Sequence, residues 1–95
     1  MTTLEDFISL LPFPKDILIA KERKKEVVDI RQMLWTLMIH SRRYRYTLHE
    51  IGDYFNRHHT TILHGIQRYE HGVLHYPHIA DRFNYYLTIW RHYGL

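Results

Sequence analysis

The sequence contains no cysteine and no long hydrophobic run. Without thiols the chain can form neither a disulfide framework nor a cysteine-ligated zinc site, and such a composition suits a reducing cytosol. Its apolar stretches are only a few residues long, which is too short for a membrane-spanning helix. The start of the chain, Met1 to Asp6, lacks the basic residues and the apolar block of a signal peptide. We therefore expect a cytoplasmic protein with no membrane association.

Residues arranged for catalysis or metal binding are also missing. The chain has no glycine-rich phosphate loop of the Walker type, and its acidic residues are scattered. Nine histidines leave one metal-binding alternative, the spacing His71-x3-His75-x2-His78. Gly72 and Pro77 interrupt the helical spacing of these histidines, and no carboxylate or cysteine completes the pattern. We expect no enzyme, no cofactor and no metal site.

Apolar residues recur at helical rather than strand spacing along the chain. A length of 95 residues with 45% hydrophobic residues is enough for one small domain and not for two. The sequence therefore predicts a single all-α domain, residues 1–95, with about five to six helices. The expected helices cover residues 2–11, 15–20, a longer stretch after the charged run 21–26, 47–55, 59–71 and a last helix through 79–90.

Local signals predict where these helices begin and end. Thr2 and Thr47 are each followed three residues later by glutamate, the pattern of a capping box. Pro12 is expected to end the first helix, and Gly72 to end the fifth before a connector over residues 73–77. Gly52 is expected where two helices pack closely. The expected core includes Val27, Ile30, Leu34, Leu37, Met38, Ile51, Phe55, Ile62, Leu63, Ile66 and Tyr69.

The most informative segment is Ile51–His64, which has the pattern of a short helix, a tight polar turn and a second helix. One arginine, two histidines and two threonines occupy the turn and the start of the second helix, with apolar residues for packing on either side. This is the arrangement of a helix-turn-helix, in which the second helix meets DNA with its N-terminal end. The charge distribution agrees, because residues 21–68 hold ten Lys/Arg against five Asp/Glu. A local positive field attracts phosphates and makes affinity depend on salt.

The chain resembles the C-terminal DNA-binding domain of the bacterial replication initiator DnaA, a Trp-repressor-like helix-turn-helix. The resemblance covers roughly residues 4–72, is strongest over 16–72, and is most specific in the last of three blocks. The blocks are Asp16-Ile17-Leu18 with Arg23-Lys24-Lys25-Glu26-Val27-Val28 and Arg31-Gln32-Met33, then Thr47-Leu48-His49-Glu50-Ile51-Gly52-Asp53-Tyr54-Phe55, then Arg57-His58-His59-Thr60-Thr61-Ile62-Leu63-His64.

Three departures from the family pattern affect what we expect. His58 stands where the family usually has the aspartate that helps to read a base, so the usual recognition sequence is not expected to carry over. The turn at residues 55–57 is one residue shorter than in many members, and the loop at residues 41–46 is longer, more basic and more aromatic. No nucleotide-binding module accompanies the domain, so we expect a free-standing DNA-binding module. A bacterial, phage or mobile-element origin and a place at the nucleoid are the corresponding expectations.

The resemblance implies a two-part contact with double-stranded DNA. Arg23, Lys24 and Lys25 correspond to a basic loop from which an arginine enters the minor groove. Arg31 and Gln32 correspond to residues that approach the DNA backbone beside the recognition helix. The implied function is sequence-specific binding in replication initiation, replication control or transcriptional regulation.

The recognition end itself has five candidate DNA contacts. Arg57 can bond guanine with two hydrogen bonds or clamp a phosphate. His58 can donate to guanine or phosphate, and His59 matches a family histidine that touches DNA. Thr60 and Thr61 each offer a hydroxyl to a phosphate or base edge and a methyl to thymine. All five lie at a helix N-terminus, where backbone N–H groups favour anions.

Two alternatives stay open at this point. The aromatic C-terminal helix, with Tyr85, Tyr86, Trp90 and Tyr93, can act as an adaptor surface for a second copy of the chain or a protein partner. If this helix only closes the core, its aromatic residues will be buried. The arginine–tyrosine loop at residues 41–46 can instead bind RNA.

Overall fold

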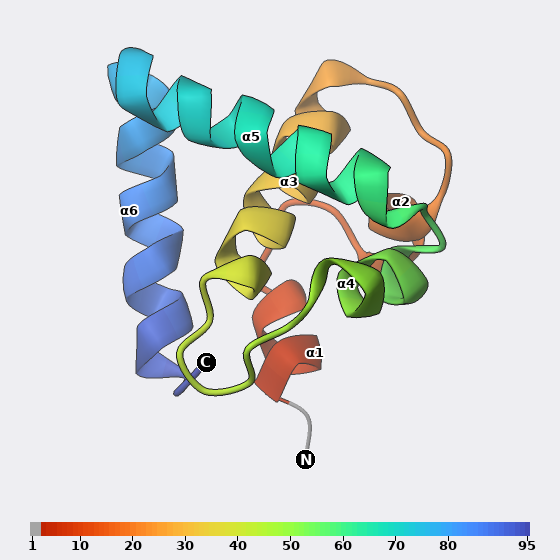
Figure 1. Ribbon diagram of the computed structural model, residues 1–95. Helices are drawn as coiled ribbons and strands as arrows, with labels where there is room; N and C mark the ends of the chain where they lie inside the picture. Colours follow the sequence, from red (N-terminus) through yellow and green to blue (C-terminus); the bar gives the residue numbers. More distant parts are fainter. Residues whose placement is uncertain (1–2) are drawn as a thin grey trace.

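The computed structural model describes residues 3–95, which form six α-helices and no β-strand (Figure 1). The fold is therefore all-α, as the sequence predicted. None of the helices within this part of the chain combines the length and apolar character that a membrane crossing requires. The helices are α1 (Thr3–Ile8), α2 (Lys15–Ile19), α3 (Lys25–Ile39), α4 (Leu48–Phe55), α5 (His59–His75) and α6 (Pro77–His92).

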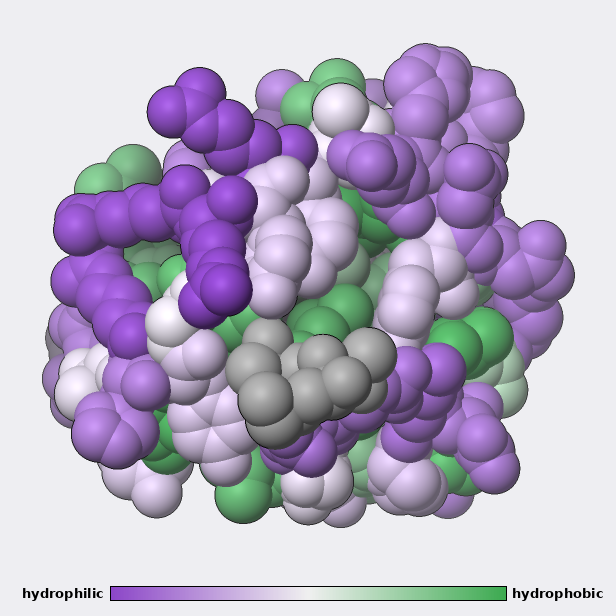
Figure 2. Space-filling model, turned by 90° about the horizontal axis from the view of Figure 1, so that it is seen from below, coloured by the Kyte–Doolittle hydropathy of each residue, from purple (hydrophilic) through white to green (hydrophobic). Residues whose placement is uncertain are grey.

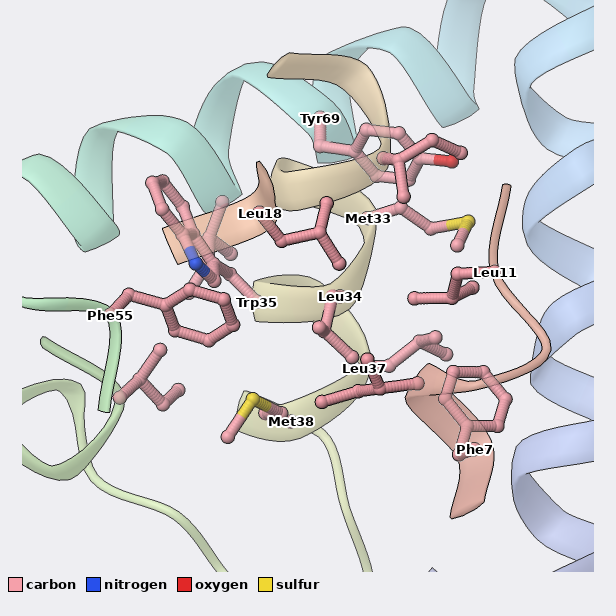
Figure 3. Packing of buried hydrophobic residues seen from close by; sticks show 14 of the residues in the cluster. Phe7, Leu11, Leu18, Met33, Leu34, Trp35, Leu37, Met38, Phe55 and Tyr69 are labelled. Carbon is pink, nitrogen blue, oxygen red and sulfur yellow. The ribbon is translucent and has the colours of Figure 1, made fainter. Parts of the chain in front are cut away.

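The central element is α3, which contacts α2, α4, α5 and α6. Because neighbours surround it, this helix is buried on nearly all sides from Met33 to Met38. On one side Trp35 meets Phe55 of α4 edge-to-face, with ring centroids 5.9 Å apart. On the other side Leu37 points toward Phe7 (Figure 3). The predicted stripe along this helix, Val27, Ile30, Leu34, Leu37 and Met38, is buried throughout and is confirmed.

Two expected helix ends were wrong. Gly72 does not end α5, which continues to His75. A glycine inside a helix costs only about 1 kcal/mol, and here its missing side chain makes room for α6. A Cβ on Gly72 would lie 3.1 Å from Cδ1 of Ile79. The break comes at Tyr76, which is extended because Pro77 follows it and starts α6. The expected connector over residues 73–77 is therefore a single residue.

The first helix is shorter than expected, because it ends at Ile8 rather than Leu11. The helical conformation is disfavoured for a residue that precedes proline, so Pro12 keeps the residue before it out of the helix. Leu11 is nevertheless buried in the core. The capping box expected at Thr2 lies outside the described residues.

One expected core residue was also wrong. Leu63 is 37% exposed, whereas Ile62 and Ile66 are buried. The buried face of α5 follows Ile62, Gly65, Ile66 and Tyr69, spaced three or four residues apart. Leu63 lies about 100° around the helix from Ile62 and so faces outward.

The aromatic residues of α6 mainly close the core. Trp90 is 1% exposed and meets Phe7 of α1 edge-to-face, with centroids 4.9 Å apart. Tyr86 and Tyr93 pack against the same phenylalanine at 6.3 and 6.2 Å and are half-buried. Only Tyr85 of the four aromatic residues considered for an adaptor surface is largely exposed, at 63%. On the face seen from below, the described residues show only small hydrophobic areas separated by hydrophilic side chains (Figure 2).

Candidate DNA-binding surface

A complete capping box starts the first helix of the helix-turn-helix. The Thr47 hydroxyl accepts a hydrogen bond from the Glu50 backbone N–H at 3.1 Å, and the Glu50 carboxylate accepts one from the Thr47 backbone N–H at 2.8 Å. This reciprocal pair satisfies two N–H groups at the helix start. The capping box expected at Thr47 is confirmed, and it determines where α4 begins.

The turn between α4 and α5 depends on the conformation of Asn56 and on the missing side chain of Gly52. Asn56 adopts the left-handed conformation, with φ 54° and ψ 50°, which asparagine tolerates better than most residues. The Arg57 backbone N–H donates to the Gly52 carbonyl at 2.8 Å. A Cβ on Gly52 would lie 2.5 Å from the Arg57 carbonyl oxygen. The close approach expected at Gly52 therefore exists, and its partner is the backbone of the turn.

His58 is the N-cap of α5. Its Nδ1 accepts a hydrogen bond from the Thr60 backbone N–H at 3.2 Å, so this nitrogen carries no proton in the capped state. Aspartate, the residue usual in the family at this position, is among the best N-cap residues. The imidazole performs the same local task, and its ring is exposed.

The cap gives a testable prediction about helix stability. We expect His58→Asp to raise the free energy of unfolding by about 0.5–1 kcal/mol, because a carboxylate caps well and interacts favourably with the helix dipole. His58→Ala removes the acceptor and should lower it by about 1 kcal/mol. Urea unfolding of the three proteins measures both changes. An alanine variant as stable as the wild type would show that the cap contributes nothing.

Three histidine rings stack beside the turn. The His59 ring lies 4.1 Å from that of His49 in α4 and 4.3 Å from that of His58, centroid to centroid. Burial lowers the pKa of His59, and the neighbouring rings of His49 and His58 lower it further. His59 is therefore mainly neutral near pH 7. Across the described residues, no group of three or more histidines or carboxylates is arranged to hold a metal ion.

This stack predicts a pH dependence of stability. Because folding disfavours protonated His59, the unfolded chain binds more protons below its own pKa of about 6.5. The contribution of neutral His59 to stability is therefore complete above about pH 6.5, and it is lost as the pH falls through the lowered pKa of His59. We expect the Tm of the wild type to fall more between pH 7 and pH 5 than that of His59→Gln. Thermal melts at both pH values test this, and equal falls in the two proteins would contradict it.

Two arginines predicted to touch DNA bond to the protein backbone. Arg31 is 5% exposed, and its Nε donates to the Leu18 carbonyl at 2.8 Å while its Nη2 donates to that of Ala20 at 3.0 Å. Arg57 donates from Nη2 to the same Ala20 carbonyl at 2.7 Å and from Nη1 to that of Ile19 at 3.0 Å. These carbonyls end α2, where no helical partner exists for them.

The two guanidinium groups therefore tie α2, α3 and the turn together. A further Nη1 bond of Arg57 reaches the Phe55 carbonyl at 2.8 Å, at the end of α4. Burial lowers the pKa of Arg31, as does the nearby charge of Arg57, and burial lowers that of Arg57. Both groups stay protonated because arginine titrates far above physiological pH. We call this arrangement the arginine latch, composed of Arg31, Arg57 and the carbonyls of Leu18, Ile19 and Ala20.

The α2–α3 loop lies directly against the helix-turn-helix turn. Lys21 Nζ donates to the Asn56 carbonyl at 3.1 Å, which joins the two segments. Within the loop, the Glu22 carboxylate accepts hydrogen bonds from the backbone N–H groups of Arg23 and Lys24 at 3.0 and 3.2 Å. These bonds order the loop while the side chains of Arg23 and Lys24 stay exposed.

A hollow of about 520 Å³ lies between this loop and the turn. Of the ten predicted site residues, it brings together Arg23, Arg31, Arg57, His58 and Thr61. An adjoining hollow between α3 and α5 contains Arg31, Arg57, Thr61 and the predicted Gln32.

The other predicted site residues lie apart from these hollows. Thr60 is exposed and His59 half-exposed in the first turn of α5, and Lys24 is exposed in the loop. Lys25 belongs to the first turn of α3, where its ammonium pairs with Asp29 at 3.1 Å.

Three basic side chains that line these hollows were missed from the sequence. Lys21 lines the first hollow, and His64 and Arg68 line the second. His64 follows Thr61 by three residues, so helical spacing alone can place it on the same face. Leu63, expected in the core, is an exposed apolar side chain on the outer face of α5.

The basic loop at residues 41–46 is separate from this surface (Figure 1). It follows the C-terminal end of α3, whereas the α2–α3 loop precedes the N-terminal end. The fifteen residues of α3 put roughly 22 Å between these ends. In the loop, Arg43 lies over the ring of Tyr44 at 5.5 Å, and Tyr44 lies 5.8 Å from Tyr46.

A capped short helix, a tight turn and a second helix that begins beside a basic loop define a helix-turn-helix DNA-binding protein. The comparison with known families then places the chain within that class. The family model described as the bacterial DnaA protein helix-turn-helix matches residues 11–68, and the chain belongs to this family. No curated protein and no solved structure matched the chain. Family membership supports DNA binding as its general function and suggests a role that is not enzymatic.

Proposed function

We propose that the chain binds duplex DNA sequence-specifically, with the start of α5 in the major groove and the α2–α3 loop in the adjacent minor groove. The observation that carries the proposal is the hydrogen bond from Lys21 Nζ to the Asn56 carbonyl, 3.1 Å long. It fixes a loop with exposed basic side chains beside the turn that presents the recognition helix. Two DNA-contacting segments held at a fixed separation can engage adjacent grooves without further ordering.

The proposed contacts fall into two groups. Thr60, Thr61 and His59 stand at the start of α5 and reach base edges, while Arg23 and Lys24 reach from the loop toward the minor groove. The exposed ring edge of His58 offers a further donor. Gln32 and the one N–H of Arg57 Nη2 that points away from Ala20 contact the backbone.

Arg31 and Arg57 have mainly a positioning role in this proposal. Hydrogen bonds from both guanidinium groups to backbone carbonyls hold the loop and the turn, and the two positive charges add to the local potential. We do not assign the minor-groove contact to Lys25, because its ammonium pairs with Asp29 of α3. The biological setting that fits is control of replication initiation or of transcription. We treat residues 1–95 as one domain, with double-stranded DNA as its partner.

Selection from a randomised duplex library at near-physiological salt tests the proposal. We expect the wild type to enrich one motif, and Thr60→Ala/Thr61→Ala to lose that enrichment, because direct base contacts are removed. Arg23→Ala should relax specificity only at the A·T-rich flank. These side chains are exposed, so the variants keep their fold, unlike variants of the arginine latch.

The matched control for selection is Thr88→Ala/Arg91→Ala on α6, which changes the same residue types far from the turn. The control should enrich the same motif as the wild type. If the wild type enriches no motif and binds all duplexes equally, sequence-specific recognition is wrong and general DNA binding remains.

A further inference from the structure

The C-terminal end of α5, opposite the turn, meets α6 (Figure 1). A third hollow lies at this junction. Its volume is about 310 Å³. Three helices contribute its polar lining, which includes Lys25, Arg68, Tyr69, His71, His78 and Arg82. Tyr69 and the residues after it lie beyond the family match, which ends at residue 68.

The charge of this hollow is mostly positive. Asp29 is its acidic residue, and the Lys25 ammonium already pairs with it at 3.1 Å. In the part of the chain that the structure describes, no ion pair involves Arg68 or Arg82. Two uncompensated guanidinium groups in one concave site attract an anion with several oxygen acceptors.

Tyr69 supplies a second and independent observation. Its side chain is 5% exposed, and its hydroxyl is buried without a hydrogen-bond partner. The hydroxyl points toward α6 (Figure 3). Burial raises the pKa of Tyr69 to about 12, so the group keeps its proton and remains a donor. A buried donor without an acceptor is costly, and an anion oxygen that enters the hollow can satisfy it.

The hollow is continuous with the recognition end. It shares Gln32 and Arg68 with the hollow between α3 and α5, and that hollow shares Thr61 and both latch arginines with the one beside the turn. A groove therefore follows α5 along its seventeen residues, about 25 Å. Lys21, Arg23, Arg68 and Arg82 line it from end to end, so a polyanion that enters at the turn meets the same sign of charge throughout.

We propose that the hollow between α3, α5 and α6 binds a backbone phosphate of the DNA that flanks the recognised site. Arg82 and Arg68 neutralise the phosphate, and the Tyr69 hydroxyl donates to one of its oxygens. This proposal rests on the proposed function, because the recognition end has to place the duplex. It makes α6 part of the DNA-binding surface and extends the bound duplex beyond the recognised site.

The test compares two duplexes across a salt series. One ends at the selected motif, and the other carries ten further base pairs on each side; random duplexes of both lengths serve if no motif is found. We expect the wild type to bind the long duplex about eightfold more tightly at 0.1 M salt, with a salt slope steeper by about 0.9. Arg82→Gln should remove both differences and leave binding to the short duplex unchanged.

Two further variants keep the test specific. Arg91→Gln removes the same charge from α6 outside this hollow and should behave as the wild type. Tyr69→Phe removes only the hydroxyl, and it should weaken binding to the long duplex while leaving the Tm unchanged or raised. These effects are differences between the two duplex lengths, so they can be measured even when no motif is selected. Loss of motif selection alone therefore contradicts the proposed function and not the proposal about this hollow.

Two results would overturn the proposal. The first is that Arg82→Gln binds the long duplex with the affinity and salt slope of the wild type, which would show that this hollow does not hold the flanking phosphate. The second is that inorganic phosphate raises the Tm of the wild type but not that of Arg82→Gln, while duplex length has no effect on affinity. The hollow is then a site for a free anion rather than for DNA.

Discussion

Replacing Arg31 by alanine is expected to lower the free energy of unfolding by about 3 kcal/mol and the Tm by roughly 15 °C. The Arg31 side chain is almost fully buried, and it donates to the carbonyls of Leu18 and Ala20 at 2.8 and 3.0 Å. Alanine leaves the Leu18 carbonyl buried without a donor and removes one of the two donors to the Ala20 carbonyl, and it also opens a cavity beside the core. The effect is large because both losses occur at once.

Thermal melts of Arg31→Ala, Arg57→Ala and a control, Arg91→Ala, measure this effect. Arg57 is only half-buried, so its loss should cost less than that of Arg31. The exposed Arg91 should change the Tm by less than about 2 °C. A fall of similar size in the control and in Arg31→Ala would mean that the latch does not stabilise the fold.

A second substitution at the same position separates positioning from direct contact with DNA. Arg31→Lys keeps a positive charge, yet a lysine cannot reproduce the forked donors that span two carbonyls. If Arg31 acts by positioning, lysine should rescue neither stability nor affinity. Full recovery of DNA affinity in Arg31→Lys, with stability still lowered, would instead identify a charge contact with the DNA backbone.

Replacing Gly65 by alanine is expected to destabilise the protein by about 2–3 kcal/mol and to weaken DNA binding at least tenfold. A Cβ at this position would lie 2.5 and 2.7 Å from two ring carbons of Trp35 and 3.3 Å from Cγ of Gln32. The Trp35 ring is buried and packs edge-to-face on Phe55, so it cannot withdraw. The helix α5 must therefore move away from α3, and the recognition end moves relative to the α2–α3 loop.

Gly72→Ala is the matched control, because it places the same methyl group on the same helix. Its Cβ would lie 3.1 Å from Cδ1 of Ile79, the end of a flexible side chain that can shift. Alanine also favours a helix interior over glycine by about 1 kcal/mol. We expect Gly72→Ala to stay within about 1 kcal/mol of the wild type and to bind DNA normally. Equal stability of the Gly65→Ala variant and this control would contradict the close packing of α3 on α5.

The sequence determined the features that depend on neighbours along the chain. The capping box of Thr47 and Glu50 forms within one helical turn, and the apolar stripe from Val27 to Met38 follows a single helix period. The order of the helix-turn-helix and its family could be predicted for the same reason, since they are carried by short consecutive motifs. The family match over residues 11–68 agrees with that prediction.

Only the tertiary structure decided the roles that depend on distant partners. Arg31 and Arg57 look like free cations in the sequence, but each donates two hydrogen bonds to carbonyls that lie 11 to 38 residues away. Gly72 has the pattern of a helix stop, yet α6 packs over it and the helix continues. Spacing along a chain encodes local hydrogen bonds and helix faces. Which charged group turns inward depends on where unpaired carbonyls lie in space, and that is settled only when the helices pack.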